Sequence, residues 1–161
     1  MPDAKEILAT AIEFERFGIE YYSRFRGLVS DEKAKPLMKS LSEDEKEHAR
    51  VLEKELRGLG GKTKPASKDM LDKGLKDIFP EGIRKNSIAS KDAITAVKLG
   101  IRTEERSIDF YSKHGASASP KLRELFARLE KMERGHKQLL EENLRYLEND
   151  GSWYGYVPIL D

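Results

Sequence analysis

Apolar residues recur every three or four positions in four long segments, the spacing of the buried face of an amphipathic helix. These segments are expected to span about 4–27, 31–57, 90–114 and 120–149. Short turns join the first two and the last two, whereas about 58–90 is weakly patterned and forms a long crossover. This order predicts an all-α protein, an antiparallel four-helix bundle with one long crossover between the second and third helices.

Local signals place the helix ends. Asp3 followed by Glu6 is a capping-box pattern, and Ser119–Pro120 is a cap followed by proline at the first helical position. Pro36 is tolerable only in the first turn of the second helix. The crossover is expected to contain a short helix over 69–79. We assign residues 1–150 to one bundle domain and 151–161 to an aromatic carboxyl-terminal tail.

The two halves of the chain resemble each other. AIEFERFGIEYY (11–22) matches GIRTEERSIDFY (100–111), and LSEDEKEH (41–48) matches LEKMERGH (129–136). The separation is 89 residues for the first match, from 11 to 100, and 88 for the second, from 41 to 129. A nearly constant separation through both helix pairs predicts a duplicated helical hairpin.

Ionisable residues interrupt the apolar stripe near the middle of each helix. The six residues are Glu15, Glu45, His48, Glu104, Glu133 and His136. A lone buried carboxylate is costly, so each needs a partner. Antiparallel packing would bring all six to one level of the bundle, a coincidence that amphipathicity alone does not require.

A pair of metal ions explains this arrangement. Residues three apart on a helix face the same way, so each Glu-x-x-His offers an oxygen and an imidazole nitrogen together. Four carboxylates balance the charge of two divalent ions, or of two ferric ions with an oxo bridge, and the mixed ligands suit iron or manganese better than calcium. One Glu-x-x-His in a helix rich in glutamate is typical of a solvated face; two at duplicated positions favour metal ligation.

Other polar and aromatic residues receive simpler interpretations. Tyr22 and Tyr111 each lie seven residues beyond a stripe glutamate, and we favour core packing over a hydrogen bond to a carboxylate or an electron-supplying role. His114 is expected at the surface near a helix end. Four acidic residues lie off the stripes and are expected to be solvated: Glu13, Glu20, Glu105 and Asp109.

Composition excludes several classes of function. The chain is 37% charged with a net charge of only +1, which argues against a nucleic-acid-binding module. It contains no cysteine, so disulfides, thiolate catalysis and rubredoxin-type centres are excluded within it. No segment has the length and apolarity of a membrane span, and MPDAKEIL has no apolar signal core. We therefore expect a cytoplasmic protein.

On these residues, about 4–148 of the chain resembles the ferritin-like di-iron proteins, specifically rubrerythrin-type and bacterioferritin-type bundles. The resemblance implies two half-sites, one with Glu15, Glu45 and His48 and the other with Glu104, Glu133 and His136. It also implies two iron ions as the cofactor, with manganese or a mixed pair as the alternative, and bridging by Glu45 and Glu133 or by Glu15 and Glu104. Rubrerythrins usually carry an additional ligand glutamate where this chain has Ser107, so the six-ligand set is closer to bacterioferritins, whereas the crossover is rubrerythrin-like.

Three functions follow as hypotheses. The first is a non-haem di-iron oxidoreductase that reacts with hydrogen peroxide or dioxygen using electrons from a separate donor protein. The second is a ferroxidase in an iron-storage oligomer, and the third is a non-catalytic metal-binding bundle. The tail, GSWYGYVPIL (151–160), is expected to cap the bundle in preference to forming a homodimer interface.

Overall fold

The computed structural model describes residues 3–63 and 90–156. The helices within these residues are α1 (Ala4–Leu28), α2 (Ala34–Gly58), α4 (Ser90–Gly115) and α5 (Pro120–Asp150). The short helix predicted over 69–79 lies outside the described residues. Among the helices that are described, none combines the length and the apolarity needed to cross a membrane.

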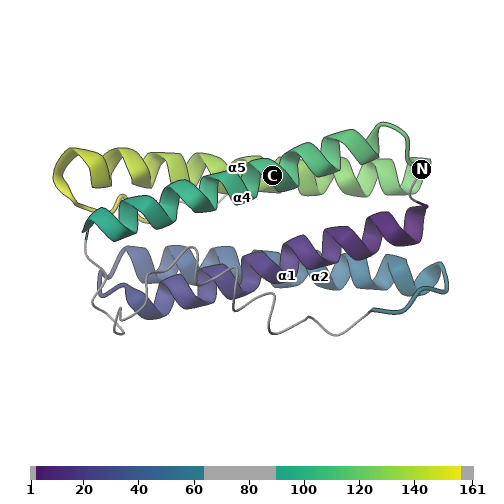
Figure 1. Cartoon of the computed structure of the whole chain (residues 1–161), viewed down its shortest axis with the longest axis horizontal. Helices are drawn as coiled ribbons and strands as arrows, with labels where there is room; N and C mark the ends of the chain where they lie inside the picture. The colour runs from purple at the N-terminus through teal and green to yellow at the C-terminus, as the bar shows by residue number, and fades with distance from the viewer. Residues whose placement is uncertain (1–2, 64–89, 157–161) are drawn as a thin grey trace.

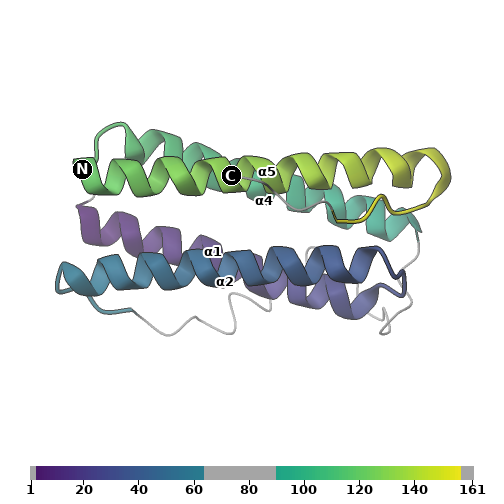
Figure 2. The ribbon, with the colours of Figure 1, turned by 180° about the vertical axis from the view of Figure 1, so that it is seen from behind.

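Two helical hairpins pack against each other. Figures 1 and 2 show α1 beside α2 in one layer and α4 beside α5 in the other. The helices within each hairpin are antiparallel, because a short turn joins them. The predicted four-helix bundle is confirmed.

Most helix ends follow the sequence signals. Ser119 stands at the N-cap of α5 as predicted, but its side chain makes no capping hydrogen bond. The capping box of Asp3 and Glu6 is formed. Helix α2 begins three residues later than expected, at Ala34, because the Asp31 carboxylate accepts hydrogen bonds from the backbone N–H groups of Lys33 and Ala34 at 2.7 and 3.2 Å and holds a turn. Pro36 therefore lies in the first turn, where its missing N–H costs nothing.

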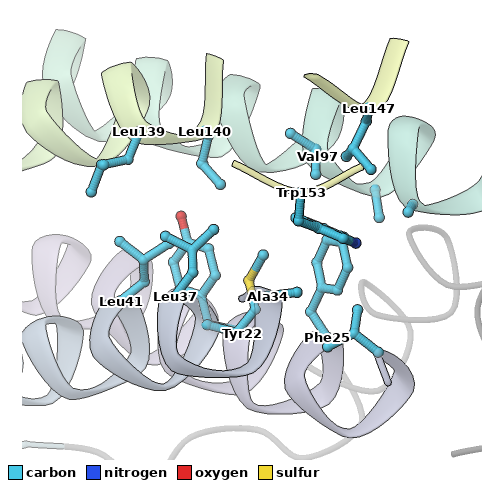
Figure 3. Close-up of a cluster of buried hydrophobic side chains, with 14 of the residues drawn as sticks. Tyr22, Phe25, Ala34, Leu37, Leu41, Val97, Leu139, Leu140, Leu147 and Trp153 are labelled. Carbon is cyan, nitrogen blue, oxygen red and sulfur yellow. The ribbon is translucent and has the colours of Figure 1, made fainter. Parts of the chain in front are cut away.

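Two apolar clusters form the core, one on each side of the level of the six ionisable residues. One contains Tyr22, Phe25, Leu37, Leu140 and Trp153, and Figure 3 shows these side chains between the hairpins. The second is built from Leu8, Ile12, Leu52, Leu56, Tyr111 and Phe126, among others. Each cluster excludes water from one end of the site, so the ionisable residues between them are buried too.

The buried face of the helices is broader than the predicted stripes. Ile19, Ile101 and Leu144 were expected to be inside but are only partly buried. Tyr21, off the predicted stripe, is fully buried, and its hydroxyl donates a hydrogen bond of 2.5 Å to the backbone carbonyl of Ala96. Helices that pack against two neighbours bury more than the narrow seam that a strict three-four repeat describes.

The tail folds back onto the bundle. Trp153 packs edge-on against Phe25 with ring centroids 5.7 Å apart (Figure 3). The fully buried Asn143 amide bonds both backbone groups of Gly155, accepting from its N–H at 2.8 Å and donating to its carbonyl at 2.9 Å. Gly155 has φ of 98°, which favours glycine, and an added Cβ would meet Lys33. Residues 151–156 thus cover the end of the bundle, as the sequence analysis predicted for the tail.

Replacing Asn143 by alanine should release the tail. The two backbone groups of Gly155 would lose their buried partner, at a cost of about 1–3 kcal/mol, or roughly 2–10 °C in melting temperature. Thermal unfolding and the fluorescence of Trp153 measure the two effects. Asn149→Ala, at an exposed position six residues away, is the matched control. Equal melting temperatures for the two variants would contradict this role of Asn143 in holding the tail.

Candidate metal centre

The six ionisable residues of the stripes converge in the middle of the bundle. All four helices contribute: Glu15 comes from α1, Glu45 and His48 from α2, Glu104 from α4, and Glu133 and His136 from α5. All six are at most 5% exposed. The sequence placed them at one level of a buried face, and the structure brings them together there.

The six side chains form two overlapping groups of possible metal ligands. The first comprises Glu15, Glu45, His48 and Glu133, and the second comprises Glu45, Glu104, Glu133 and His136. Within each group the four donor atoms lie within 4.8 Å of one another. Glu45 and Glu133 belong to both groups, so two bound ions would share them, and each ion would have one further glutamate and one histidine.

The two histidines occupy mirrored positions. His48 Nδ1 lies 2.9 Å from Glu133 and 3.4 Å from Glu15. His136 Nδ1 lies 2.9 Å from Glu45 and 3.5 Å from Glu104. The imidazole rings are nearly parallel, with centroids 5.9 Å apart. The duplication seen in the sequence is thus a pseudo-twofold symmetry of the site.

Each outer glutamate is held by a tyrosine of the opposite hairpin. The Tyr111 hydroxyl donates to Glu15 Oε1 at 2.5 Å, and the Tyr22 hydroxyl donates to Glu104 Oε1. We favoured plain core packing for both tyrosines; they are buried in the core but also bond the carboxylates, so the second alternative describes them better. Burial, followed by the nearby carboxylate charges, raises the pKa of both phenols, which therefore stay protonated donors at neutral pH.

Five buried donor atoms that face the centre make no hydrogen bond, although two of them, His136 Nδ1 and Glu45 Oε1, lie 2.9 Å apart. They are Glu15 Oε2, Glu45 Oε1, Glu104 Oε2, Glu133 Oε2 and His136 Nδ1. Buried polar atoms are normally paired, and five unpaired ones at one point are costly unless a cation satisfies them. Oxygen and imidazole donors in this number fit iron or manganese. The residues present therefore fit a pair of divalent metal ions.

The pKa shifts of the metal-free site also indicate a place for positive charge. Burial, and then repulsion by Glu133, raises the pKa of Glu45 and of Glu104 well above the usual range. Burial opposes charge on Glu133 as well, but its contacts with Glu104 and both histidines lower its pKa. Burial would also lower the pKa of His48, yet Glu133 and Glu15 raise it to about 10. Protons therefore occupy the site where metal charge would otherwise balance the carboxylates.

Sequence reasoning missed two residues beside the site. Asp44 on α2 accepts a hydrogen bond from His136 Nε2 at 3.0 Å, and its position directly before Glu45 was the available signal. Gly18 on α1 leaves space for Glu45, since an added Cβ would lie 3.0 Å from Glu45 Oε2.

Ser107, at the position of the additional family glutamate, is buried and offers no carboxylate. The four acidic residues expected off the stripes are solvent-exposed or at the surface: Glu13, Glu20, Glu105 and Asp109.

Gly18→Ala should weaken metal binding without unfolding the protein. The new methyl group would displace the Glu45 carboxylate by a few tenths of an ångström, and we expect a roughly tenfold loss of metal affinity. Alanine favours the helix by up to about 1 kcal/mol, which limits any loss of stability. Gly27→Ala, with no atom within 4 Å of its added Cβ, is the control for metal titration and thermal unfolding. Unchanged affinity in Gly18→Ala would show that the contact is unimportant.

Together these features define a ferritin-like four-helix bundle with a buried carboxylate–histidine cluster. A sequence model of the rubrerythrin family matches residues 6–144, and the chain belongs to this family. Its members carry a ferritin-like di-iron domain, so the family implies a metal-binding protein, typically of iron.

A solved structure shares the fold. A hypothetical protein from Pyrococcus furiosus superposes with a TM-score of 0.67 at 22% sequence identity, over 94% of each chain. A search of curated proteins finds no match. The structural neighbour therefore supports the ferritin-like bundle and adds no assignment of activity.

Proposed function

We propose that this protein is a non-haem di-iron oxidoreductase that reduces hydrogen peroxide or dioxygen. The observation that supports the proposal is the buried cluster of four glutamates and two histidines, in which five inward atoms make no hydrogen bond. Glu45 and Glu133 would hold both ions. Glu15 with His48 would complete one position, and Glu104 with His136 the other.

Reduction of hydrogen peroxide to two water molecules consumes two electrons and two protons. When bound, two ferrous ions supply the two electrons. The chain's own residues fix where the ions lie and keep bulk water out. Tyr22 and Tyr111 hold one oxygen of Glu104 and Glu15, which leaves the other oxygen of each carboxylate for the centre.

The electrons for repeated turnover are proposed to come from a separate protein. The chain has no cysteine that could hold a rubredoxin-type iron centre. The donor, the preferred oxidant and the cytoplasmic location remain predictions from the sequence, as does the identity of the metal as iron in place of manganese.

Ferroxidase action in a storage oligomer is the second candidate. It is favoured by Ser107, because a site with six protein ligands lacks the additional glutamate usual in rubrerythrins. Size-exclusion chromatography separates the candidates: a closed cage of many copies supports storage, and a monomer or dimer excludes it.

Peroxide consumption by the iron-loaded protein tests the proposed activity. The reduced protein should consume about one hydrogen peroxide per chain as two ferrous ions become ferric, and an added electron donor should restore it for further cycles. Glu47→Gln, at an exposed position on α2, should retain this activity, whereas Glu45→Gln should lose it. A loaded wild-type protein that consumes no more peroxide than free iron would overturn the proposal.

A further inference from the structure

The pseudo-twofold symmetry of the site is broken on the outer side of the two histidines. The frames that carry the two Glu-x-x-His pairs read LSEDEKEH and LEKMERGH, so Asp44 before Glu45 corresponds to Met132 before Glu133. The contacts that face the centre are otherwise mirrored, with 2.9 Å from each histidine Nδ1 to the shared glutamate of the opposite hairpin. The asymmetry therefore concerns the Nε2 side of the imidazoles, which faces away from the shared glutamates.

Asp44 bonds the outer side of His136. Its Oδ2 lies 3.0 Å from His136 Nε2, while His136 Nδ1 faces the glutamates. Because a carboxylate only accepts, Nε2 must carry the hydrogen, and the lone pair of the neutral ring is then on Nδ1. The Asp44 side chain is 34% exposed, so its charge is not itself trapped in the core. His136 is held in the tautomer and orientation that a metal ligand requires.

His48 has no such support. Within residues 3–63 and 90–156, His48 Nε2 has no hydrogen bond from the protein. The ring contacts Glu15, Glu133 and the His136 ring. The corresponding residue on α5, Met132, has a thioether, which is a weak acceptor and carries no charge. A carboxylate on the second ring nitrogen makes a histidine a more basic ligand and is commonly worth about 10- to 100-fold in metal affinity.

We propose that Asp44 makes the metal position at Glu104 and His136 the tighter of the two, so that it fills first. Asp44 is a positioning residue that acts through His136. The position at Glu15 and His48 binds its ion more weakly and releases it first. This inference rests on the proposed di-metal site and adds an order of loading to it.

Calorimetric titration of the metal-free protein with Co²⁺ tests the order. The first ion should bind about 10- to 100-fold more tightly than the second. Asp44→Leu should lower the affinity for the first ion by about the same factor. Asp44→Asn, whose amide oxygen still accepts from Nε2 but lacks the charge, should fall between Asp44→Leu and wild type. Glu43→Gln, at the exposed neighbouring position, removes one negative charge and should leave both affinities unchanged.

Single-site variants separate intrinsic asymmetry from repulsion between two bound ions. His48→Ala should bind its first Co²⁺ within about threefold of wild type, whereas His136→Ala should bind it about 10- to 100-fold more weakly. Met132→Asp should in turn tighten the second ion of the wild-type site. Circular dichroism confirms that each variant is folded.

Each outcome has a distinct meaning. Equal first-ion affinities in His48→Ala and His136→Ala, or an equal effect of Glu43→Gln and Asp44→Leu, would overturn the order of loading while leaving the di-metal site in place. Failure of the wild-type protein to bind Co²⁺ at all would overturn the site and this inference with it.

Discussion

Glu45→Gln is expected to abolish binding of both metal ions, and Glu133→Gln should do the same. Each of these glutamates belongs to both groups of donor atoms, so its loss removes a charged ligand from two positions at once. We expect the affinity for each ion to fall by more than about 100-fold, above the effect of disturbing a residue that merely supports a ligand. Metal analysis after dialysis should show a drop from about two ions per chain to nearly none.

The same substitution should stabilise the metal-free protein at high pH. Glu45 is buried, and burial with repulsion from Glu133, Glu15 and Glu104 raises its pKa, so ionising it costs free energy. A neutral amide of the same size cannot ionise, so at a pH high enough to deprotonate Glu45 the variant avoids a buried charge, whose replacement commonly gains about 1–4 kcal/mol. At pH 9 the melting temperature of the metal-free variant should rise above that of the metal-free wild type.

Glu47→Gln is the matched control, because Glu47 is exposed on the same helix and lies two residues away. It should keep both metal ions and leave the metal-free melting temperature within about 2 °C, as for most surface substitutions. Two ions retained by Glu45→Gln would contradict the shared-ligand geometry. A lower melting temperature at pH 9 without metal would contradict the electrostatic account of the empty site.

The metal-free protein should lose stability as the pH rises from 6 to 9. The pKa of His48 is raised from 6.5 to about 10 on folding. Burial opposes charge on His136, but its contacts with Glu104, Asp44 and Glu133 raise its pKa. Burial and then repulsion by Glu133 raise the pKa of Glu45 and Glu104. A group whose pKa is raised on folding stabilises the protein fully below its unfolded pKa and loses that effect as the pH rises through the folded pKa. Because the pKa of Glu133 is lowered on folding, its ionisation changes the stability only below about pH 4.5 and not between pH 6 and 9.

Metal should reverse this dependence, because ions bind the deprotonated ligands and release their protons. We expect the metal-free melting temperature to fall by about 5–10 °C from pH 6 to 9, and the increase caused by metal to grow over the same interval. Thermal unfolding with chelator and with added metal measures both. Glu45→Gln should flatten the curve of the metal-free protein. A metal-free melting temperature that is constant or rises across this range would contradict the assigned protonation.

The fold and the inward residues were predictable because helical period is a local property. Glu15 and Glu104 stand in stripes that step by three and four, so their side of the helix follows from neighbours in the sequence. The capping box at Asp3 depends on residues three apart and was predicted for the same reason. The start of α2 was placed too early, because Asp31 holds a turn that resembles a helical first turn in sequence.

Contacts between helices were less predictable. The bond from Asp44 to His136 depends on how far α2 is rotated against α5, which no single-helix pattern contains. Tyr22 and Tyr111 were on the stripes, but their carboxylate partners lie on the opposite hairpin. Gly18 offered no signal, since its role is the absence of a side chain beside Glu45. Periodicity identifies a buried face but does not say which atoms meet there.

Metal content of the freshly purified protein tests the central claim most directly. Elemental analysis of wild type and Glu45→Gln, expressed with iron and purified side by side, should give about two ions per wild-type chain and nearly none in the variant. The wild-type protein should also show a ferric absorption band that reductant bleaches. A wild-type chain without bound metal, or with the same metal content as Glu45→Gln, would contradict a di-metal centre at these six residues.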